Sequence, residues 1–280
     1  MGDLINREHQ VFFQTYKRLP IEIDHASGAK IWDRDGNEYL DFLAGIAVNA
    51  LGHSHPKIIE AAKKQISQYM HVSNYFYQEP QILLAEKLTQ LTGYSRVFFT
   101  NSGTEATDGA IKLVRKYSFG RDKKIIAAFT GGFHGRTYGA LSIMDKPKYK
   151  ENMGPFLPDT MVLKFNDIDE LERNINDQTA AVFLEFIQGE GGIATPTQQF
   201  VDKLEELRKT QKKQKNAVAQ TDSLDQEREV IDEMWNQIYH HTLLSPRRHY
   251  IQILDRNGDL LFRSQSLRGH SLQYPELPYQ

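Results

Sequence analysis

The alternation of short apolar segments with helical stretches is the feature that most constrains the fold. Apolar runs of three to seven residues recur through the middle of the chain, and helical spacing fills the intervals after the first and third of them. Strands that alternate with helices usually lie parallel in one sheet. The pattern therefore predicts an α/β domain with a mainly parallel sheet and flanking helices. The runs are VFF (97–99), KIIAAF (124–129), MVLKF (161–165) and AVFLEFI (181–187).

The N-terminal part has a different pattern. Residues 31–43 read as two strands joined at Asp35-Gly36, a dipeptide typical of tight hairpins. Residues 56–70 and 80–92 each open with a proline and carry apolar residues at helical spacing. We expect a hairpin followed by two helices.

Composition excludes several classes of function. The chain has 34 Lys plus Arg against 36 Asp plus Glu, which gives no support to a nucleic-acid binder. It has no cysteine, so disulfides and thiolate chemistry are excluded. No apolar run reaches the roughly 18 residues of a membrane span, and the first residues lack a signal-peptide pattern. His53 and His55 have no third ligand at metal-site spacing. We expect a cytoplasmic protein without metal or membrane partners.

The first chemically unusual segment is Thr100–Ala106, between the VFF run and a helix expected at 104–117. Small hydroxyl residues and a glycine at a helix start leave backbone amides free, and these amides suit a phosphate group. An ordinary helix cap formed by Ser102 or Thr104 is the alternative.

The second is Gly131–Thr137, after the KIIAAF run. The Phe133 ring beside glycines suits stacking on a planar ligand, and Arg136 suits a carboxylate. The alternative is a surface loop with a solvated arginine.

The third is Glu185–Gly192, at the end of the AVFLEFI run. An acid in that position needs a partner if it is buried. The alternative to a ligand contact is pairing with a structural arginine.

Taken together, these segments resemble the class III pyridoxal-phosphate-dependent aminotransferases. The resemblance covers residues 5–208, and GIAVNALGHSHP and His134 favour the acetylornithine branch of the family. It implies an incomplete fold-type I transferase: residues 1–75 from the small domain and 76–208 from the cofactor-binding large domain. The matching motifs are LDFLAGIAVNALGHSHPKI (40–58), FFTNSGTEATDGAIKLVRKY (98–117), GGFHGRTYGALS (131–142) and EFIQGEGGI (185–193).

The resemblance also implies roles for single residues. The cofactor would be pyridoxal 5′-phosphate, with its phosphate at Ser102, Gly103 and Thr104 and its ring on Phe133. The α-carboxylate of the substrate would bind Arg136. The remaining implied roles are Glu185 and Gln188 beside the cofactor, Glu185 also on the substrate side, Tyr75 or Tyr77 at the entrance, and Glu190 paired with an arginine from later in the family's chain.

The activity implied is amino transfer between N2-acetylornithine, or a related ω-amino acid, and 2-oxoglutarate, as in arginine biosynthesis. The small-molecule partners would be an amino acid and a 2-oxo acid, and the family resemblance implies a homodimer. The protein must also supply a lysine for the Schiff base and an acid for the ring nitrogen.

The family's later motifs are absent from this sequence. The last lysine is Lys215, so no lysine occupies the late position of the Schiff-base lysine, and no catalytic residue is identified. Asp255 stands in IQILDRNG, where Asn257-Gly258 indicates a hairpin turn better than a cofactor site.

The last part of the chain differs from the rest. Residues 209–225 are polar and charged, as in a linker or a frayed helix, and residues 226–280 predict a helix at 226–243 and a strand pair within 249–262. YIQILDRNGDLLFRSQSL resembles a strand pair of extracytoplasmic sensor regions. Two hypotheses follow: an aminotransferase, or a truncated or hybrid non-catalytic domain joined to a small, sensor-like α+β tail.

Overall fold

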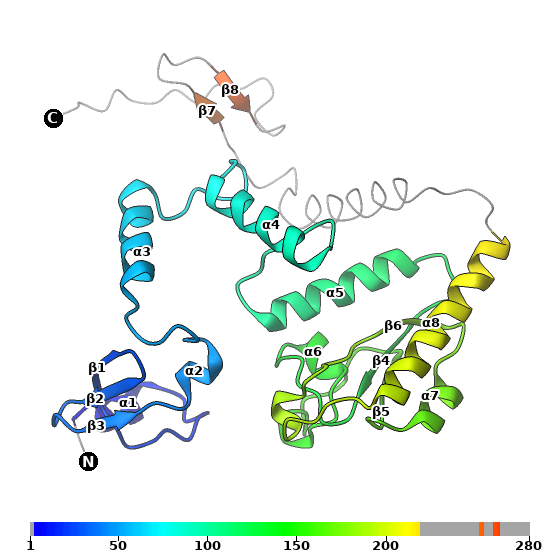
Figure 1. The fold of residues 1–280 in the computed structure, drawn as a ribbon, viewed down its shortest axis with the longest axis horizontal. Helices are drawn as coiled ribbons and strands as arrows, with labels where there is room; N and C mark the ends of the chain where they lie inside the picture. Colours follow the sequence, from blue (N-terminus) through cyan, green and yellow to red (C-terminus); the bar gives the residue numbers. More distant parts are fainter. Residues whose placement is uncertain (1–2, 219–251, 255–259, 264–280) are drawn as a thin grey trace. The chain divides into compact units, whose positions relative to one another are not determined.

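The structure, a computed structural model, describes residues 3–218, 252–254 and 260–263 (Figure 1). The chain divides into two compact units, Met1–Val97 and Phe98–Gln280. This division falls later than the predicted domain boundary between residues 75 and 76. Each unit is described by itself.

The first unit contains a three-stranded antiparallel sheet. Its strands are β1 (Ile23–Ser27), β2 (Lys30–Asp33) and β3 (Glu38–Leu40), in the order β1-β2-β3. Asp33 organises the β2–β3 turn: its carboxylate accepts hydrogen bonds from the Asn37 side-chain Nδ2 at 2.9 Å, the Tyr39 hydroxyl at 2.7 Å and the Asn37 backbone amide at 2.8 Å. These bonds hold the pKa of Asp33 below its usual range. The hairpin predicted at Asp35-Gly36 is confirmed.

The other regular elements described in the first unit are helices. The two predicted from proline-led periodic segments are present as α3 (Pro56–Gln68) and α4 (Glu79–Thr92), each with proline in its first turn. Proline suits this place because its missing N–H would have no partner there. The unit also contains α1 (Asp3–Val11) and the short segment α2 (Ala44–Ala47).

A parallel sheet forms the centre of the second unit. The strands β4 (Ile125–Phe129), β5 (Thr160–Leu163) and β6 (Thr179–Val182) lie in the order β5-β4-β6, and both pairings are parallel. The central strand β4 is apolar throughout because it is covered on both faces. The predicted α/β class with a parallel sheet is confirmed.

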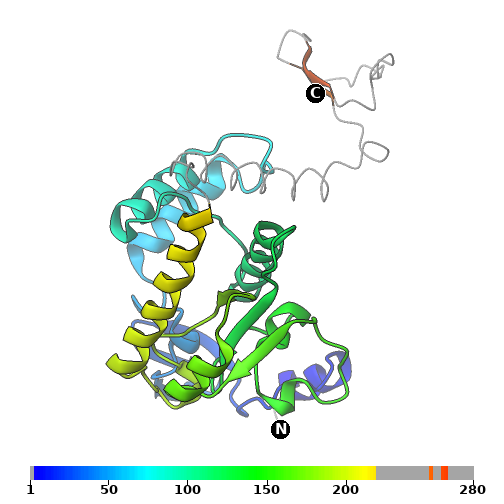
Figure 2. The ribbon, with the colours of Figure 1, turned by 90° about the vertical axis from the view of Figure 1, so that its right-hand side faces the viewer.

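Helices cover both faces of this sheet (Figures 1 and 2). Side chains alternate along β4: Ile126 and Ala128 pack with Ile111 and Ile143, whereas Ala127 and Phe129 pack with Leu171 and Phe200. Two small cores result, one on each face. The helices are α5 (Gly103–Ser118) and α6 (Tyr138–Ser142) on the first face, and α7 (Ile168–Asn174) and α8 (Gln198–Val218) on the second.

Two predicted strands differ from the structure. The VFF run at 97–99 is irregular backbone, and the AVFLEFI run is strand only up to Val182, with one further bond from the Phe183 amide to the Ala127 carbonyl. A strand requires a hydrogen-bonded neighbour. No strand lies beside VFF within the described ranges. The apolar character of this run is therefore not enough to make it a strand.

The last described segments bear on the predicted linker and tail. Helix α8 continues to Val218, so residues 209–218 are helical backbone. The strands β7 (Gln252–Leu254) and β8 (Leu260–Arg263) pair antiparallel, which confirms the predicted strand pair. The helix expected at 226–243, the Asn257-Gly258 turn and Asp255 lie outside the described residues. No helix in the described part of the chain is long and apolar enough to cross a membrane.

Candidate active site

Three segments meet at the carboxyl edge of the β5-β4-β6 sheet, where parallel sheets bind their ligands. They are the start of α5, the loop after β4 and the loop after β6. Hydrogen bonds join the loop after β4 to each of the other two, as the next paragraphs describe. The structure thereby brings together seven of the predicted site residues: Ser102, Gly103, Thr104, Phe133, Arg136, Glu185 and Gln188.

The start of α5 is a capped helix N-terminus. The Ser102 side chain accepts a hydrogen bond from the Glu105 amide at 3.4 Å, and Glu105 in return accepts one from the Asn101 amide at 2.7 Å. The arrangement is close to a capping box, but the Glu105 carboxylate accepts from the residue before the N-cap and not from the N-cap amide itself. The Gly103 and Thr104 amides, by contrast, donate to no group in the described part of the chain, and the space around the Gly103 Cα is open.

The Thr104 side chain supports the loop after β4. Its Oγ1 lies 2.9 Å from the Thr137 Oγ1 and accepts from the Thr137 amide at 3.2 Å. Gly135, at φ +122°, passes so close that an added Cβ would lie 2.2 Å from that oxygen. One turn along α5, the Thr107 hydroxyl donates to the His134 carbonyl at 2.8 Å. The loop is therefore held directly on the helix start.

Phe133 and Arg136 project from this same loop. The Phe133 ring is half-buried, and its centroid lies 6.3 Å from that of Tyr149 in an edge-to-face arrangement. Arg136 is exposed, with its guanidinium carbon 5.3 Å from the Tyr149 centroid. The loop thus presents an aromatic ring and an arginine within reach of one aromatic side chain.

Glu185 lies in the loop after β6, three residues beyond the end of the strand. Its Oε1 accepts a hydrogen bond from the Phe133 amide, so its described partner is backbone and not the structural arginine of the alternative interpretation. A Cβ added at Gly132 would lie 3.4 Å from this oxygen and 3.1 Å from the His134 Nε2. The two titratable side chains converge on Gly132.

His134, in the loop after β4, has a lowered pKa. Burial of its ring, which contacts Phe183 edge-to-face at 6.0 Å, lowers the pKa of the imidazole, and the nearby charge of Glu185 opposes this effect. His134 is therefore neutral at pH 7 and occupies a position between the sheet and the loop.

Gln188 joins the two loops from within. Its side chain is 3% exposed, and its Nε2 donates to the Thr130 carbonyl at 2.9 Å. Added Cβ atoms at Gly131 and Gly191 would lie 2.7 and 2.6 Å from its Oε1. The Gln188 side chain is therefore packed tightly between the backbones of the two loops.

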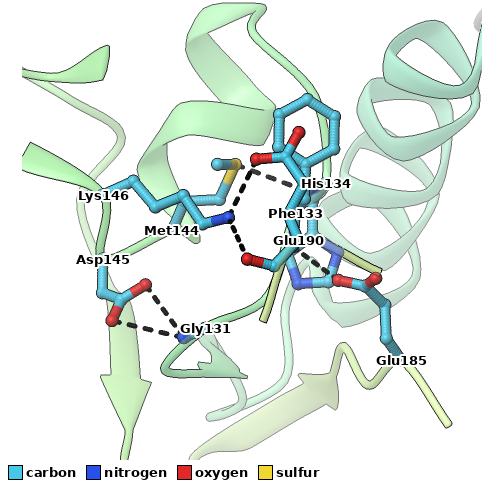
Figure 3. Close-up of polar contacts among 8 residues, drawn as sticks. All are labelled: Gly131, Phe133, His134, Met144, Asp145, Lys146, Glu185 and Glu190. Carbon is cyan, nitrogen blue, oxygen red and sulfur yellow. Dashed lines mark hydrogen bonds and ion pairs between the residues drawn. The ribbon is translucent and has the colours of Figure 1, made fainter. Parts of the chain in front are cut away.

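Three consecutive residues that the sequence did not single out complete the site (Figure 3). Met144 Sδ accepts from the His134 amide at 3.3 Å, and the Asp145 carboxylate accepts from the Gly131 amide at 3.2 Å. Lys146 Nζ donates to Glu190 Oε2 at 2.9 Å, where the family resemblance implies a later arginine. MDK follows α6 without a periodic or motif signal, so only the folded chain shows this convergence.

Tyr75 belongs to the first unit, where it is 49% exposed. Its role at the substrate entrance remains a prediction.

Comparisons with known proteins identify the family of the chain. The family description "Aminotransferase class-III" matches residues 12–215. The acetylornithine aminotransferase of Methanocaldococcus jannaschii is 45% identical over 206 residues, 72% of this chain and 52% of that protein. The acetylornithine aminotransferase of Methanopyrus kandleri is 45% identical over 207 residues, 73% of this chain and 52% of that protein.

A solved structure shows the same fold. The ornithine aminotransferase of Toxoplasma gondii has a TM-score of 0.71 and 30% identity, covering 75% of this chain and 51% of that one. The chain therefore spans about half the length of the relatives it matches. Class III aminotransferases depend on pyridoxal phosphate, and on the extent of the match this chain belongs to the class III aminotransferase family.

Proposed function

We propose that the protein is a pyridoxal-phosphate-dependent aminotransferase that moves an amino group between N2-acetylornithine, or a related ω-amino acid, and 2-oxoglutarate. The observation that carries the proposal is the attachment of the Phe133–Arg136 loop to the start of α5 through Thr104. This attachment links the free backbone amides at the helix start to the loop that carries the aromatic ring and the arginine. The naming of the curated relatives supports the acetylornithine substrate.

The residues present fit the phosphate and the ring of the cofactor. The amides of Gly103 and Thr104 are open at the positive end of a 16-residue helix, and nothing lies within 4 Å of an added Cβ at Gly103. We assign the phosphate to Ser102, Gly103 and Thr104, and the face of the pyridine ring to Phe133.

The substrate side is assigned in the same way. Arg136 would bind the α-carboxylate, because its guanidinium forms paired hydrogen bonds with carboxylates. Glu185 would line the cofactor and substrate side, with Gln188 fixing the loop beneath it and Tyr75 near the entrance. When bound, pyridoxal phosphate supplies an electron sink for the charge that develops as a proton leaves the substrate carbon. The chain's own residues bind, orient and hold these groups.

A homodimer in the cytoplasm is part of the same proposal, supported by the family resemblance. Sedimentation of the purified chain tests it, with a species of twice the chain mass as the expected result.

A non-catalytic, hybrid domain is the second candidate. The observation that favours it is the sequence after residue 215, which contains no lysine, while the family match also ends at residue 215. Such a domain would bind the cofactor without turnover.

One experiment separates the two. The chain is purified with pyridoxal phosphate, dialysed, reduced with borohydride and mapped by mass spectrometry. A pyridoxyl group on one lysine, together with amino transfer from N2-acetylornithine to 2-oxoglutarate, supports the aminotransferase. A colourless protein without transfer contradicts it, and cofactor retained without transfer supports the second candidate.

A further inference from the structure

Lys146 connects the two loops of the candidate site. Its ammonium donates to the Glu190 carboxylate at 2.9 Å and also to the Glu190 carbonyl at 3.3 Å (Figure 3). The preceding residue, Asp145, accepts from the Gly131 amide with both carboxylate oxygens, at 3.2 and 3.3 Å. One short segment thus holds the start of the loop after β4 and the Gly189–Gly191 turn of the loop after β6.

The pair differs from an ordinary surface ion pair. Exposed pairs contribute little because water screens them and both side chains lose freedom. Here the Lys146 side chain is only 15% exposed and has two acceptors on the same residue, whereas the Glu190 side chain is 41% exposed. Charge-assisted bonds from a largely buried ammonium are stronger than their exposed counterparts.

Lys146 also lies beside the ring assigned to the cofactor. Its ammonium is 5.7 Å from the Phe133 centroid, within the range of cation–π attraction. The positive charge that neutralises Glu190 is therefore next to the surface on which a planar ligand would stack. Without Lys146, the Glu190 carboxylate would carry an uncompensated negative charge close to an anionic ligand. Like charges repel, so the ligand would bind less tightly.

We propose that Lys146 is a positioning residue of the candidate site, which holds the Glu190 loop against the Phe133 loop and cancels the charge of Glu190 beside the ring. This inference rests on the proposed function in one respect, since it names a residue that supports the binding of the same cofactor. Lys146 does not touch the ligand in this role. It acts through Glu190.

The first measurement concerns the ligand-free chain. The amides of Gln188, Gly191 and Ile193 are hydrogen-bonded within the loop after β6, so their hydrogen exchange reports on its order. Lys146→Met should speed their exchange about 3- to 10-fold, the range expected for losing one partly buried ion pair. Lys146→Arg keeps the charge and should restore most of the protection.

The second measurement uses pyridoxamine 5′-phosphate, which binds without bonding to a lysine. Titration by calorimetry should show affinity about 3- to 10-fold weaker for Lys146→Met. In a Glu190→Gln background the same substitution should change affinity less than about twofold, because no charge remains to cancel. This cycle tests neutralisation separately from loop order.

Lys203→Met is the matched control. Lys203 pairs with Glu172 and Glu206 at 2.8 Å and is 21% exposed, but it joins α7 and α8 away from the site. It should leave both the loop exchange and the pyridoxamine phosphate affinity unchanged.

The outcomes are distinguishable. Unchanged exchange in Lys146→Met overturns the inference, and so does faster exchange with unchanged ligand affinity, since Lys146 would then be structural only. Equal losses with Lys203→Met also overturn it. If the unsubstituted chain does not bind pyridoxamine phosphate, the proposed function fails, while the exchange data still decide whether Lys146 holds the two loops together.

Discussion

The hydroxyl groups of Thr104 and Thr137 lie 2.9 Å apart. Thr104 is the second residue of α5, next to the amides assigned to phosphate, and Thr137 directly follows Arg136, assigned to the substrate carboxylate. Two binding functions that are 32 residues apart in sequence, from Thr104 to Arg136, therefore share one side-chain contact. A change in Thr104 should affect both.

Thr104→Val should test this coupling. Valine keeps the shape but leaves the half-buried Thr137 amide without an acceptor, which should lower the free energy of unfolding by about 1–2 kcal/mol. Urea unfolding measures the loss, and calorimetry should show weaker binding of pyridoxamine phosphate. Thr104→Ser, which retains the hydroxyl, should behave nearly as the unsubstituted chain; equal losses in both variants would contradict the hydrogen-bond explanation.

Gly135→Ala should be more damaging. The backbone there has φ +122°, and an added Cβ would lie 2.2 Å from the Thr104 Oγ1 and 2.9 Å from the Thr104 Cα. Strain and steric overlap together should lower the free energy of unfolding by about 2–4 kcal/mol. Gly103→Ala, which meets nothing within 4 Å, is the control and should change stability by less than about 1 kcal/mol. Equal stability of the two variants would show that the loop is not held on the helix as described.

These glycine and threonine contacts could not be predicted from the sequence, although other features of the fold and the site could. The alternation of strands and helices was predictable, because short apolar runs such as Ile125–Phe129 alternate with glycine-containing loops and helically spaced segments. The ligand loops were predictable from the resemblance. The support for them was not, since Thr104 and Met144–Lys146 contact the loops only through tertiary packing, and spacing along the chain does not encode such contacts.

Strand limits were harder to predict for a related reason. The run AVFLEFI is apolar except for Glu185, yet β6 ends at Val182, whose partner in β4 is Ala127, although β4 itself continues to Phe129. VFF at 97–99 is equally apolar and is not a strand. Hydrophobicity indicates burial, but the partner strand decides where a ladder begins and ends.

Phe200→Ala should show how much the core between the sheet and the helices α7 and α8 contributes to stability. The Phe200 ring is fully buried and lies 5.1 Å from Phe129 and 5.7 Å from Phe165, centroid to centroid. Its loss should lower the free energy of unfolding by about 3–5 kcal/mol, measured by urea denaturation followed by circular dichroism. Phe186→Ala, at a residue 65% exposed in the same unit, should cost less than about 1 kcal/mol. Comparable losses at both positions would contradict a core centred on β4 and α8.

Acidification should lower the stability of the folded chain because the buried His134 imidazole is neutral. Burial holds its folded-state pKa below the ordinary value of 6.5, so the unfolded chain binds a proton over a pH range where the folded chain does not. Stability from this group is therefore complete above pH 6.5 and falls as the pH drops through that value towards the folded-state pKa. The Glu185 charge opposes the shift, so the folded imidazole still titrates at lower pH.

The test compares His134→Gln with the unsubstituted chain in urea unfolding between roughly pH 8 and pH 5. Glutamine does not titrate, so the unsubstituted chain should lose more stability on acidification than the variant, and the gap between them should narrow as the pH falls. His71→Gln, at an exposed position in the first unit, is the control and should retain the pH dependence of the unsubstituted chain. Parallel curves for His134→Gln and the unsubstituted chain would mean that His134 is as accessible to protons in the folded loop as in the unfolded chain, and the packing of its ring on Phe183 would then not exclude water.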